Sequence, residues 1–114
     1  MKDPIVFIKL GGSLITDKTR PGVARHAVIR RLAKELASAT RRSRGPRIIL
    51  GHGSGSFGHA AAADGGLTRG ADVRRRVDAI ALTQHRAALL HRLVVAALVE
   101  AGARPFSFAA SSFL

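Results

Sequence analysis

The chain has 114 residues, 46% of them hydrophobic, and it contains no cysteine. This length suffices for one modest domain with a core. The lack of thiols excludes disulfides and thiolate metal sites. The first apolar run is interrupted by Lys9 and is too short for a signal peptide or a membrane span, so we expect a cytoplasmic protein that contacts no membrane.

The formal net charge is +12, from 19 Lys and Arg against 7 Asp and Glu. A charge of this size fits the binding of nucleic acid or of anionic small molecules. The only aromatic residues are Phe, no nucleic-acid motif is present, and many arginines fall on predicted helices. We therefore interpret most of the charge as solvated helix faces and expect no nucleic-acid partner.

Predicted strands and helices alternate along the sequence. Residues 5–10 form a short apolar run ending in two glycines, which predicts a buried strand. Residues 26–43 carry apolar side chains at helical spacing, and residues 47–50 predict a second strand. A long amphipathic helix is predicted over 72–101 and a third strand over 105–108. This order predicts an α/β fold with a parallel sheet and helices packed on its faces.

Two glycine-rich loops follow the first two strands. The first covers residues 9–13 (KLGGS), with Lys18 shortly after it, and the second covers residues 51–59 (GHGSGSFGH). In a parallel sheet both loops emerge at the carboxyl edge, where open α/β folds bind ligands. Glycines let backbone N–H groups approach a phosphate closely. Two such loops facing each other suit a kinase whose acceptor already carries a phosphate.

Other interpretations of these loops fit less well. Glycines 53, 55 and 58 satisfy the dinucleotide pattern G-x-G-x-x-G, but no strand ending in an acidic residue follows about twenty positions later. Neither glycine run precedes Lys-Ser or Lys-Thr, which excludes a Walker A loop. Either loop alone could be a tight turn. Both together, flanked by Lys9, Lys18 and His59, favour phosphate chemistry.

Several of these residues also have a structural interpretation. An unpaired Lys9 at the end of a buried strand would be costly, which favours a functional role. Lys18 could be an ordinary loop lysine and His59 a helix cap. We expect His52 to be structural, with a hydrogen bond inside its loop. Surface or helix-packing positions are expected for His26, His85 and His91.

The two loops together resemble the amino acid kinase superfamily and, within it, the isopentenyl phosphate kinases. The matching segments are residues 8–18 and 51–59, with a weaker match at 104–107 and 111–113. They span nearly the whole chain, and the run ending in Phe57-Gly58-His59 is the specific part. Fosfomycin kinases keep this closing histidine as well, and sibling kinases of carboxylates or carbamates keep the glycines.

The resemblance implies a three-layer αβα sandwich with a mainly parallel sheet. It implies ATP-dependent phosphorylation of isopentenyl phosphate to isopentenyl diphosphate in isoprenoid biosynthesis, with Mg²⁺ as cofactor and a homodimer at full length. The catalytic residues would be Lys9 at the transferring phosphoryl group, Lys18 between donor and acceptor phosphates, and His59 on the acceptor phosphate.

The resemblance also implies a binding role for further residues. The ATP phosphates would lie at Lys9, Gly11, Gly12 and Ser13. The acceptor phosphate would contact Gly53, Ser54, Gly55, Gly58 and His59. The hydrocarbon part of the acceptor would contact Ile80, Thr83, Gln84 and Ala87, where the small residues leave room for a longer chain. The resemblance implies no metal ligand among the residues of the chain.

The chain differs from the superfamily in length. Kinases of this superfamily are considerably longer, and their C-terminal half supplies most of the nucleotide site. We therefore expect residues 1–114 to be the N-terminal, acceptor- and phosphate-binding part of such a domain, inactive by itself. If the chain stands alone, a non-catalytic phosphate-binding or interaction domain is the alternative.

Overall fold

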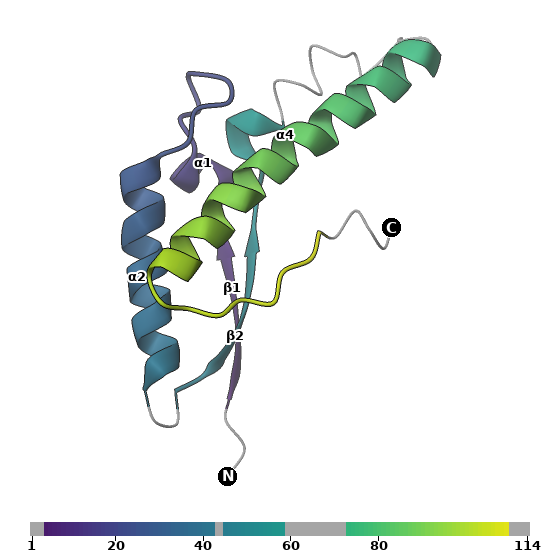
Figure 1. The fold of residues 1–114 in the computed structure, drawn as a ribbon. Coiled ribbons are helices and arrows are strands. Elements are labelled where there is room, and N and C mark those ends of the chain that lie inside the picture. Colours follow the sequence, from purple (N-terminus) through teal and green to yellow (C-terminus); the bar gives the residue numbers. More distant parts are fainter. Residues whose placement is uncertain (1–3, 43–44, 59–72, 110–114) are drawn as a thin grey trace.

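The computed structural model describes residues 4–42, 45–58 and 73–109. Strands β1 (Ile5–Leu10) and β2 (Arg47–His52) form a parallel pair with Leu10 opposite His52. The other elements, shown in Figure 1, are α1 (Gly12–Ile15), α2 (His26–Arg41), the 3₁₀ turn η1 (Gly55–Phe57) and α4 (Val73–Glu100). The parallel pairing predicted from the sequence is confirmed, and so is the alternation of strands and helices as far as α4.

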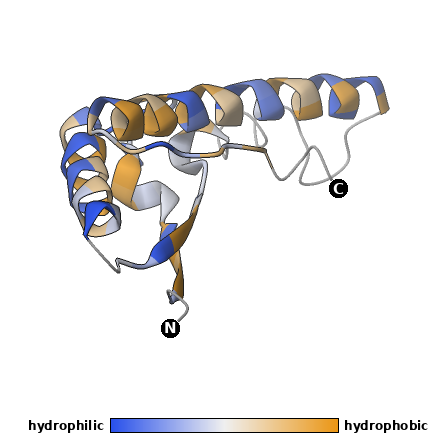
Figure 2. Ribbon diagram, turned by 60° about the horizontal axis from the view of Figure 1, so that its bottom comes forward, coloured by the Kyte–Doolittle hydropathy of each residue, from blue (hydrophilic) through white to orange (hydrophobic). Residues whose placement is uncertain are grey.

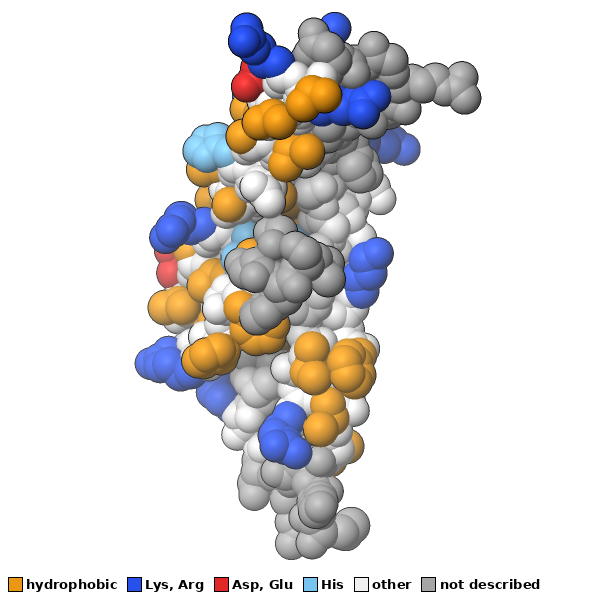
Figure 3. All heavy atoms as spheres, turned by 90° about the vertical axis from the view of Figure 1, so that its right-hand side faces the viewer, with side chains coloured by type: hydrophobic (Ala, Val, Ile, Leu, Met, Phe, Trp, Pro, Cys, Tyr) orange, Lys and Arg blue, Asp and Glu red, His pale blue; other side chains and the backbone are white. Residues whose placement is uncertain are grey.

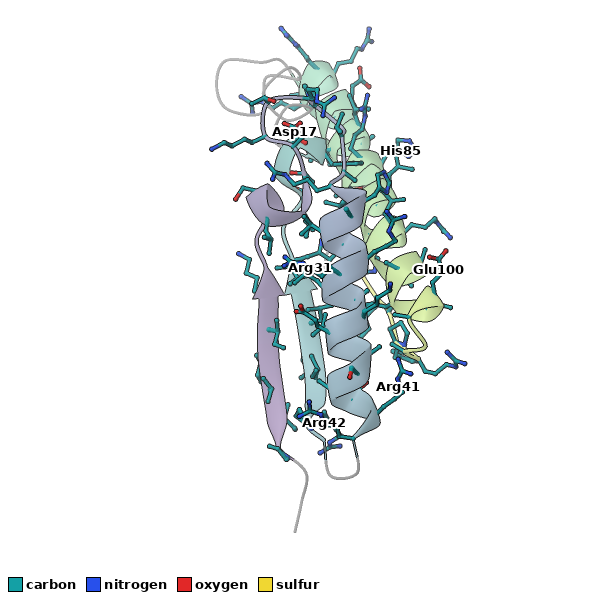
Figure 4. The ribbon with its side chains drawn as sticks, turned by 90° about the vertical axis from the view of Figure 1, so that its left-hand side faces the viewer. Asp17, Arg31, Arg41, Arg42, His85 and Glu100 are labelled. Carbon is teal, nitrogen blue, oxygen red and sulfur yellow. The ribbon has the colours of Figure 1, made fainter. Side chains whose placement is uncertain are left out.

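Both long helices pack on the same face of the strand pair. Ile8 and Leu50, which pair across the strands, contact a buried cluster that includes Ile29 of α2 and Leu90 of α4. No described helix covers the opposite face, and Phe7 there is 76% exposed. Figure 4 shows the strands on one side and both helices on the other. The described residues thus form two of the three predicted layers.

Helices α2 and α4 contact each other through small side chains and one arginine. Ala33 and Ala37 of α2 are buried, which allows a close approach of the helix that packs on them. Arg41 at the end of α2 donates to the carbonyl of Ala101 at 2.6 Å and to the carbonyl of Ala37 at 3.3 Å. The guanidinium therefore connects the C-terminal ends of both helices.

The C-terminal half of α4 supplies this helix's part of the core cluster, and in the N-terminal half Ala79 is also buried. Leu90, Val94 and Leu98 are buried, whereas Val77 and Ile80 are 59% and 49% exposed. Figure 2 shows hydrophobic and hydrophilic residues alternating along the whole helix, and Figure 3 shows hydrophobic side chains gathered on the face opposite α2. No helix among the described residues combines the length and the apolarity that a membrane crossing needs.

The third strand predicted over residues 105–108 does not form. This segment runs past β2 without backbone pairing, and Phe106 and Phe108 are 92% and 63% exposed. A groove of about 260 Å³ lies between the segment, β2 and α4. Apolar side chains at alternate positions predicted a strand, but without backbone hydrogen bonds to β2 the segment stays irregular.

The two glycine loops pack backbone against backbone at the carboxyl ends of the strands. A Cβ on Gly12 would lie 2.6 Å from the Cα of Gly55, and a Cβ on Gly55 would lie 2.6 Å from the carbonyl oxygen of Gly12. Gly55 also has φ +50°, in the left-handed region that glycine tolerates best. Glycine is therefore required at both positions for the loops to meet.

Replacing one core residue tests the packing of α4. Leu90→Ala is expected to lower the free energy of unfolding by about 2–5 kcal/mol, because Leu90 is fully buried between the helices and the strands. The matched control is Leu89→Ala, since Leu89 is 44% exposed and should lose less than about 1 kcal/mol. Urea unfolding followed by circular dichroism measures both, and equal losses would contradict this packing.

Two glycine substitutions test the loop contact. Gly55→Ala should cost about 2 kcal/mol or more, because its methyl group would overlap Thr16 Oγ1 and the carbonyl oxygen of Gly12. Gly11→Ala should cost less than about 1 kcal/mol, because nothing lies within 4 Å of its Cβ position. Thermal unfolding of the two variants gives the comparison. A Gly55→Ala protein as stable as Gly11→Ala would show that the loops do not touch.

Candidate functional site

A cleft of about 420 Å³ lies between the two glycine loops. It is lined by Lys9, Gly12, Ser13, Thr16, Lys18, Pro21, Gly53, Ser54, Gly55 and Ser56. The first loop, the segment after it and the second loop therefore contribute to one site. The structure brings Lys9 and Lys18 to the same cleft, as the sequence predicted.

Lys9 reaches the cleft from an exposed strand position. It lies on β1 opposite Gly51 of β2, on the face that the helices leave uncovered. The prediction that Lys9 ends a buried strand is wrong, because α2 and α4 cover only the other face of the pair. Burial therefore gives no reason for a functional role of Lys9, and only its position at the cleft supports one.

Lys18 is carried by a short loop that Asp17 organises. The Asp17 carboxylate accepts hydrogen bonds from the backbone N–H and the hydroxyl of Thr19. It also forms an ion pair with Arg20, whose Nε lies 2.9 Å from Asp17 Oδ2. The two hydrogen bonds from Thr19, followed by that of Arg20, hold the pKa of Asp17 well below its usual range. Figure 4 shows Asp17 in the loop ahead of α2. The carboxylate thus shapes the loop that positions Lys18.

Thr16 is the buried connection between the loops, and the sequence did not single it out. It is fully buried, and its hydroxyl donates to the carbonyl of Gly12 at 2.6 Å. The same oxygen accepts from the backbone N–H of Ser56 at 3.1 Å. A threonine just after a glycine loop carries little signal in sequence, because only the fold brings Ser56 to it.

The second loop is fixed at its start and end. The N–H of Gly53 donates to the carbonyl of Leu10 at 3.0 Å, which continues the pairing beyond β2. The carbonyl of Ser56 accepts from the N–H of Gly22 at 3.2 Å, which connects this loop to the Lys18 loop. Gly58 is buried against the side chain of Ser54. The backbone of this loop is therefore held in one shape before any ligand arrives.

Several other predicted site residues either do not line the cleft or lie outside the described residues. Gly11 is exposed beside it and has open space where a side chain would be. His59 lies outside the described residues. Along α4, Ile80 and Gln84 are exposed while Thr83 and Ala87 are half-buried, and Thr83 is 3.9 Å from the Cβ position of Gly58. None of these four α4 residues lines the cleft.

The histidines divide into two groups. His26 and His85 are exposed, as predicted, and Figure 4 shows His85 pointing away from the strands. His52 bonds to Gly53 within its loop, also as predicted. His91 does more than pack, because it bonds to His52 of β2 and to Ser107 beyond α4. Neither contact is visible in a helical pattern.

The chemistry of the cleft suits an anion. Among the described residues, two lysines line the cleft and no Asp or Glu does. Groups of three or more His, Asp or Glu that could hold a metal ion are absent from the described residues. Backbone amides from two loops and two ammonium groups can bind and neutralise phosphate oxygens. The arrangement can therefore place two phosphate groups close together.

Comparisons with known proteins identify the family of this chain. The amino acid kinase family model matches residues 4–114. The isopentenyl phosphate kinase of Methanothermobacter thermautotrophicus is 34% identical over 116 aligned residues, covering 96% of this chain and 42% of that protein. The isopentenyl phosphate kinase of Thermoplasma acidophilum is 32% identical over 103 residues, covering 90% of this chain and 40% of that protein.

Solved structures of isopentenyl phosphate kinases also superpose on this chain. A product complex of T. acidophilum isopentenyl phosphate kinase superposes with a TM-score of 0.79 at 30% identity, over 92% of this chain and 42% of that one. A substrate complex of an isopentenyl phosphate kinase superposes with a TM-score of 0.78 at 31% identity, over 94% and 42%. The chain thus spans about two fifths of the length of these relatives. It belongs to the amino acid kinase family.

Proposed function

We propose that the protein transfers the γ-phosphoryl group of ATP to isopentenyl phosphate and forms isopentenyl diphosphate. The observation that carries the proposal is the single cleft in which two glycine loops and two lysines meet. The two relatives named isopentenyl phosphate kinase support the choice of acceptor. Residues 1–114 would supply the acceptor- and phosphate-binding part of the enzyme.

In this proposal the first loop holds the donor phosphates. The amides of Gly11, Gly12 and Ser13 and the ammonium group of Lys9 would contact the β- and γ-phosphates of ATP. The open space at Gly11 suits a bulky ligand against the backbone. Mg²⁺ would add positive charge at these phosphates. No residue of the chain is proposed as its ligand.

The second loop would hold the acceptor phosphate. Gly53, Ser54 and Gly55 would contribute backbone donors, with Gly58 keeping the loop compact and His59 orienting the acceptor oxygens. Lys18 would bridge the two phosphate groups from the opposite loop. Ile80, Thr83, Gln84 and Ala87 would face the hydrocarbon chain, which extends from the loop toward α4.

The reaction needs positioning more than proton transfer. A phosphate oxygen of the acceptor attacks the γ-phosphorus, a new P–O bond forms, and the bond to the ADP oxygen breaks. The attacking oxygen is already nucleophilic, so a strong general base is not required. Charge spreads over the equatorial oxygens, and Lys9 and Lys18 would neutralise it from two sides.

The test is an assay with radiolabelled ATP and isopentenyl phosphate, using the longest polypeptide that the gene encodes. Lys9→Met and Lys18→Met should each lower kcat by about 100-fold, because each removes a charge at the transferring group. His59→Ala should lower turnover by about tenfold or more. The control is Lys34→Met, an exposed α2 position outside the cleft, which should keep full activity.

The outcomes separate the acceptors. Turnover on isopentenyl phosphate that depends on Lys9 and Lys18 supports the proposal. Turnover on fosfomycin, a carbamate or a carboxylate, with none on isopentenyl phosphate, would replace the acceptor but keep the family. Binding of isopentenyl phosphate without any turnover by the longest product would leave a phosphate-binding domain and contradict the enzymatic role.

A further inference from the structure

A chain of hydrogen bonds runs from the second loop through two histidines to the segment after α4. His52 Nδ1 lies 2.9 Å from the carbonyl oxygen of Gly53. His52 Nε2 lies 2.8 Å from His91 Nδ1, and the two ring planes are inclined by 20° with their centroids 5.1 Å apart. His91 Nε2 bonds to Ser107 Oγ. Three segments far apart in the sequence therefore meet at this pair.

The Gly53 carbonyl fixes where the protons lie. A carbonyl only accepts, so His52 Nδ1 must carry a proton. In a neutral His52 ring, Nε2 is then an acceptor, so His91 Nδ1 must donate to it. In a neutral His91 ring, Nε2 is in turn an acceptor, and the Ser107 hydroxyl donates. A single tautomer on each ring satisfies all three bonds.

The pair can hold one extra proton but not two. With one proton added, either ring still donates to the other, and Ser107 accepts instead of donating. With two added, both facing nitrogens carry hydrogens and the bond between the rings is lost. The groove around the pair is lined by apolar residues and Ser107, and His52 and His91 are its titratable groups.

This chain ends on the peptide that precedes Ser54. The peptide bonds of the described residues are trans, so the N–H of Ser54 points away from the Gly53 carbonyl. The Gly53 N–H donates to Leu10, whereas the Ser54 N–H finds no acceptor among the described residues. Ser54 lines the cleft. The bond from His52 to the Gly53 carbonyl therefore fixes the orientation of the Gly53–Ser54 peptide and, with it, the direction of the Ser54 N–H.

We propose that His91 is a positioning residue for the phosphate-binding loop. His91 acts through His52, which fixes the Gly53–Ser54 peptide. The Ser54 amide is thereby prepared to donate to an acceptor phosphate. The inference rests on the proposed function, because it assumes that this loop binds a phosphate. It extends the site by a residue on α4 that touches neither donor nor acceptor.

The first test reads the tautomers directly. Nitrogen-15 correlation spectra of the 114-residue chain at about pH 7.5 should show both His52 and His91 protonated at Nδ1. Free histidine prefers the other tautomer, so an ordinary spectrum for either ring would overturn the hydrogen-bonded chain. His85 provides the internal reference, because it is exposed and outside this network.

The second test measures binding of isopentenyl phosphate by calorimetry. His91→Phe keeps a flat ring of similar size but cannot donate to His52, and the affinity should fall about three- to tenfold. His91→Asn keeps a donor near the Nδ1 position and should recover most of the affinity. His85→Phe, on the exposed face of the same helix, should bind like the wild type. Equal affinity of all four proteins would overturn the role of His91.

Acidification gives a third readout. Burial, followed by the nearby charge of His52, lowers the pKa of His91 from its ordinary value of 6.5. The unfolded chain therefore binds more protons there than the folded chain, so stability should fall as the pH drops below about 6.5. His91→Phe should lose less stability between about pH 7.5 and pH 5 than the wild type. An identical loss in both proteins would contradict the half-buried, hydrogen-bonded pair.

The proposed acceptor and the positioning role of His91 can be contradicted separately. If the wild-type chain binds no isopentenyl phosphate while the tautomers are as described, the proposed acceptor is wrong and the role of His91 falls with it. If the wild type binds and His91→Phe binds equally well, only the positioning inference fails. If His91→Phe does not fold, His91→Asn and the tautomer spectra decide.

Discussion

The site depends on the contact between the backbones of Gly12 and Gly55. Each glycine occupies the space that a Cβ on the other would need. This approach allows Thr16 to bond to both loops at once, with its hydroxyl between the Gly12 carbonyl and the Ser56 amide. The parallel pairing of β1 and β2 brings the two loops to one edge, and the glycines let them touch.

The remaining structure holds this contact in place from outside. Helices α2 and α4 cover one face of the strands through Ile29, Leu90 and Val94. Asp17 shapes the loop that brings Lys18 to the cleft. Lys9 and Lys18 therefore come from two segments that are anchored independently of each other. Such preorganisation suits phosphoryl transfer, in which positioning and charge neutralisation lower the barrier.

The sequence predicted those parts of the fold that depend on local pattern. The strand before Gly11, the helix from His26 and the long helix ending at Glu100 follow from apolar periodicity and glycine stops. The meeting of the two loops followed from the rule that parallel strands end at one edge. Family resemblance added catalytic and binding roles that no pattern contains, and all of these roles stay predictions.

What the sequence missed depends on tertiary contacts. Lys9 was expected to be buried, but a strand with only one covered face has alternate positions exposed. Residues 105–108 have the apolar alternation of a strand, yet the segment forms no backbone bonds with β2. Thr16 bonds to Ser56, which is 40 positions away, and His91 bonds to His52, which is 39 positions away. Sequence pattern carries no information about such pairs.

The most direct measurement is a titration of the nitrogen-15-labelled chain with isopentenyl phosphate, followed by amide spectra. If the second loop binds the acceptor phosphate in the shared cleft, the Ser54 amide should shift most, and the amide of Gly12, which lies against Gly55, should follow it with the same dissociation constant. A Ser54 amide that does not move, or different constants for Ser54 and Gly12, would contradict a shared site.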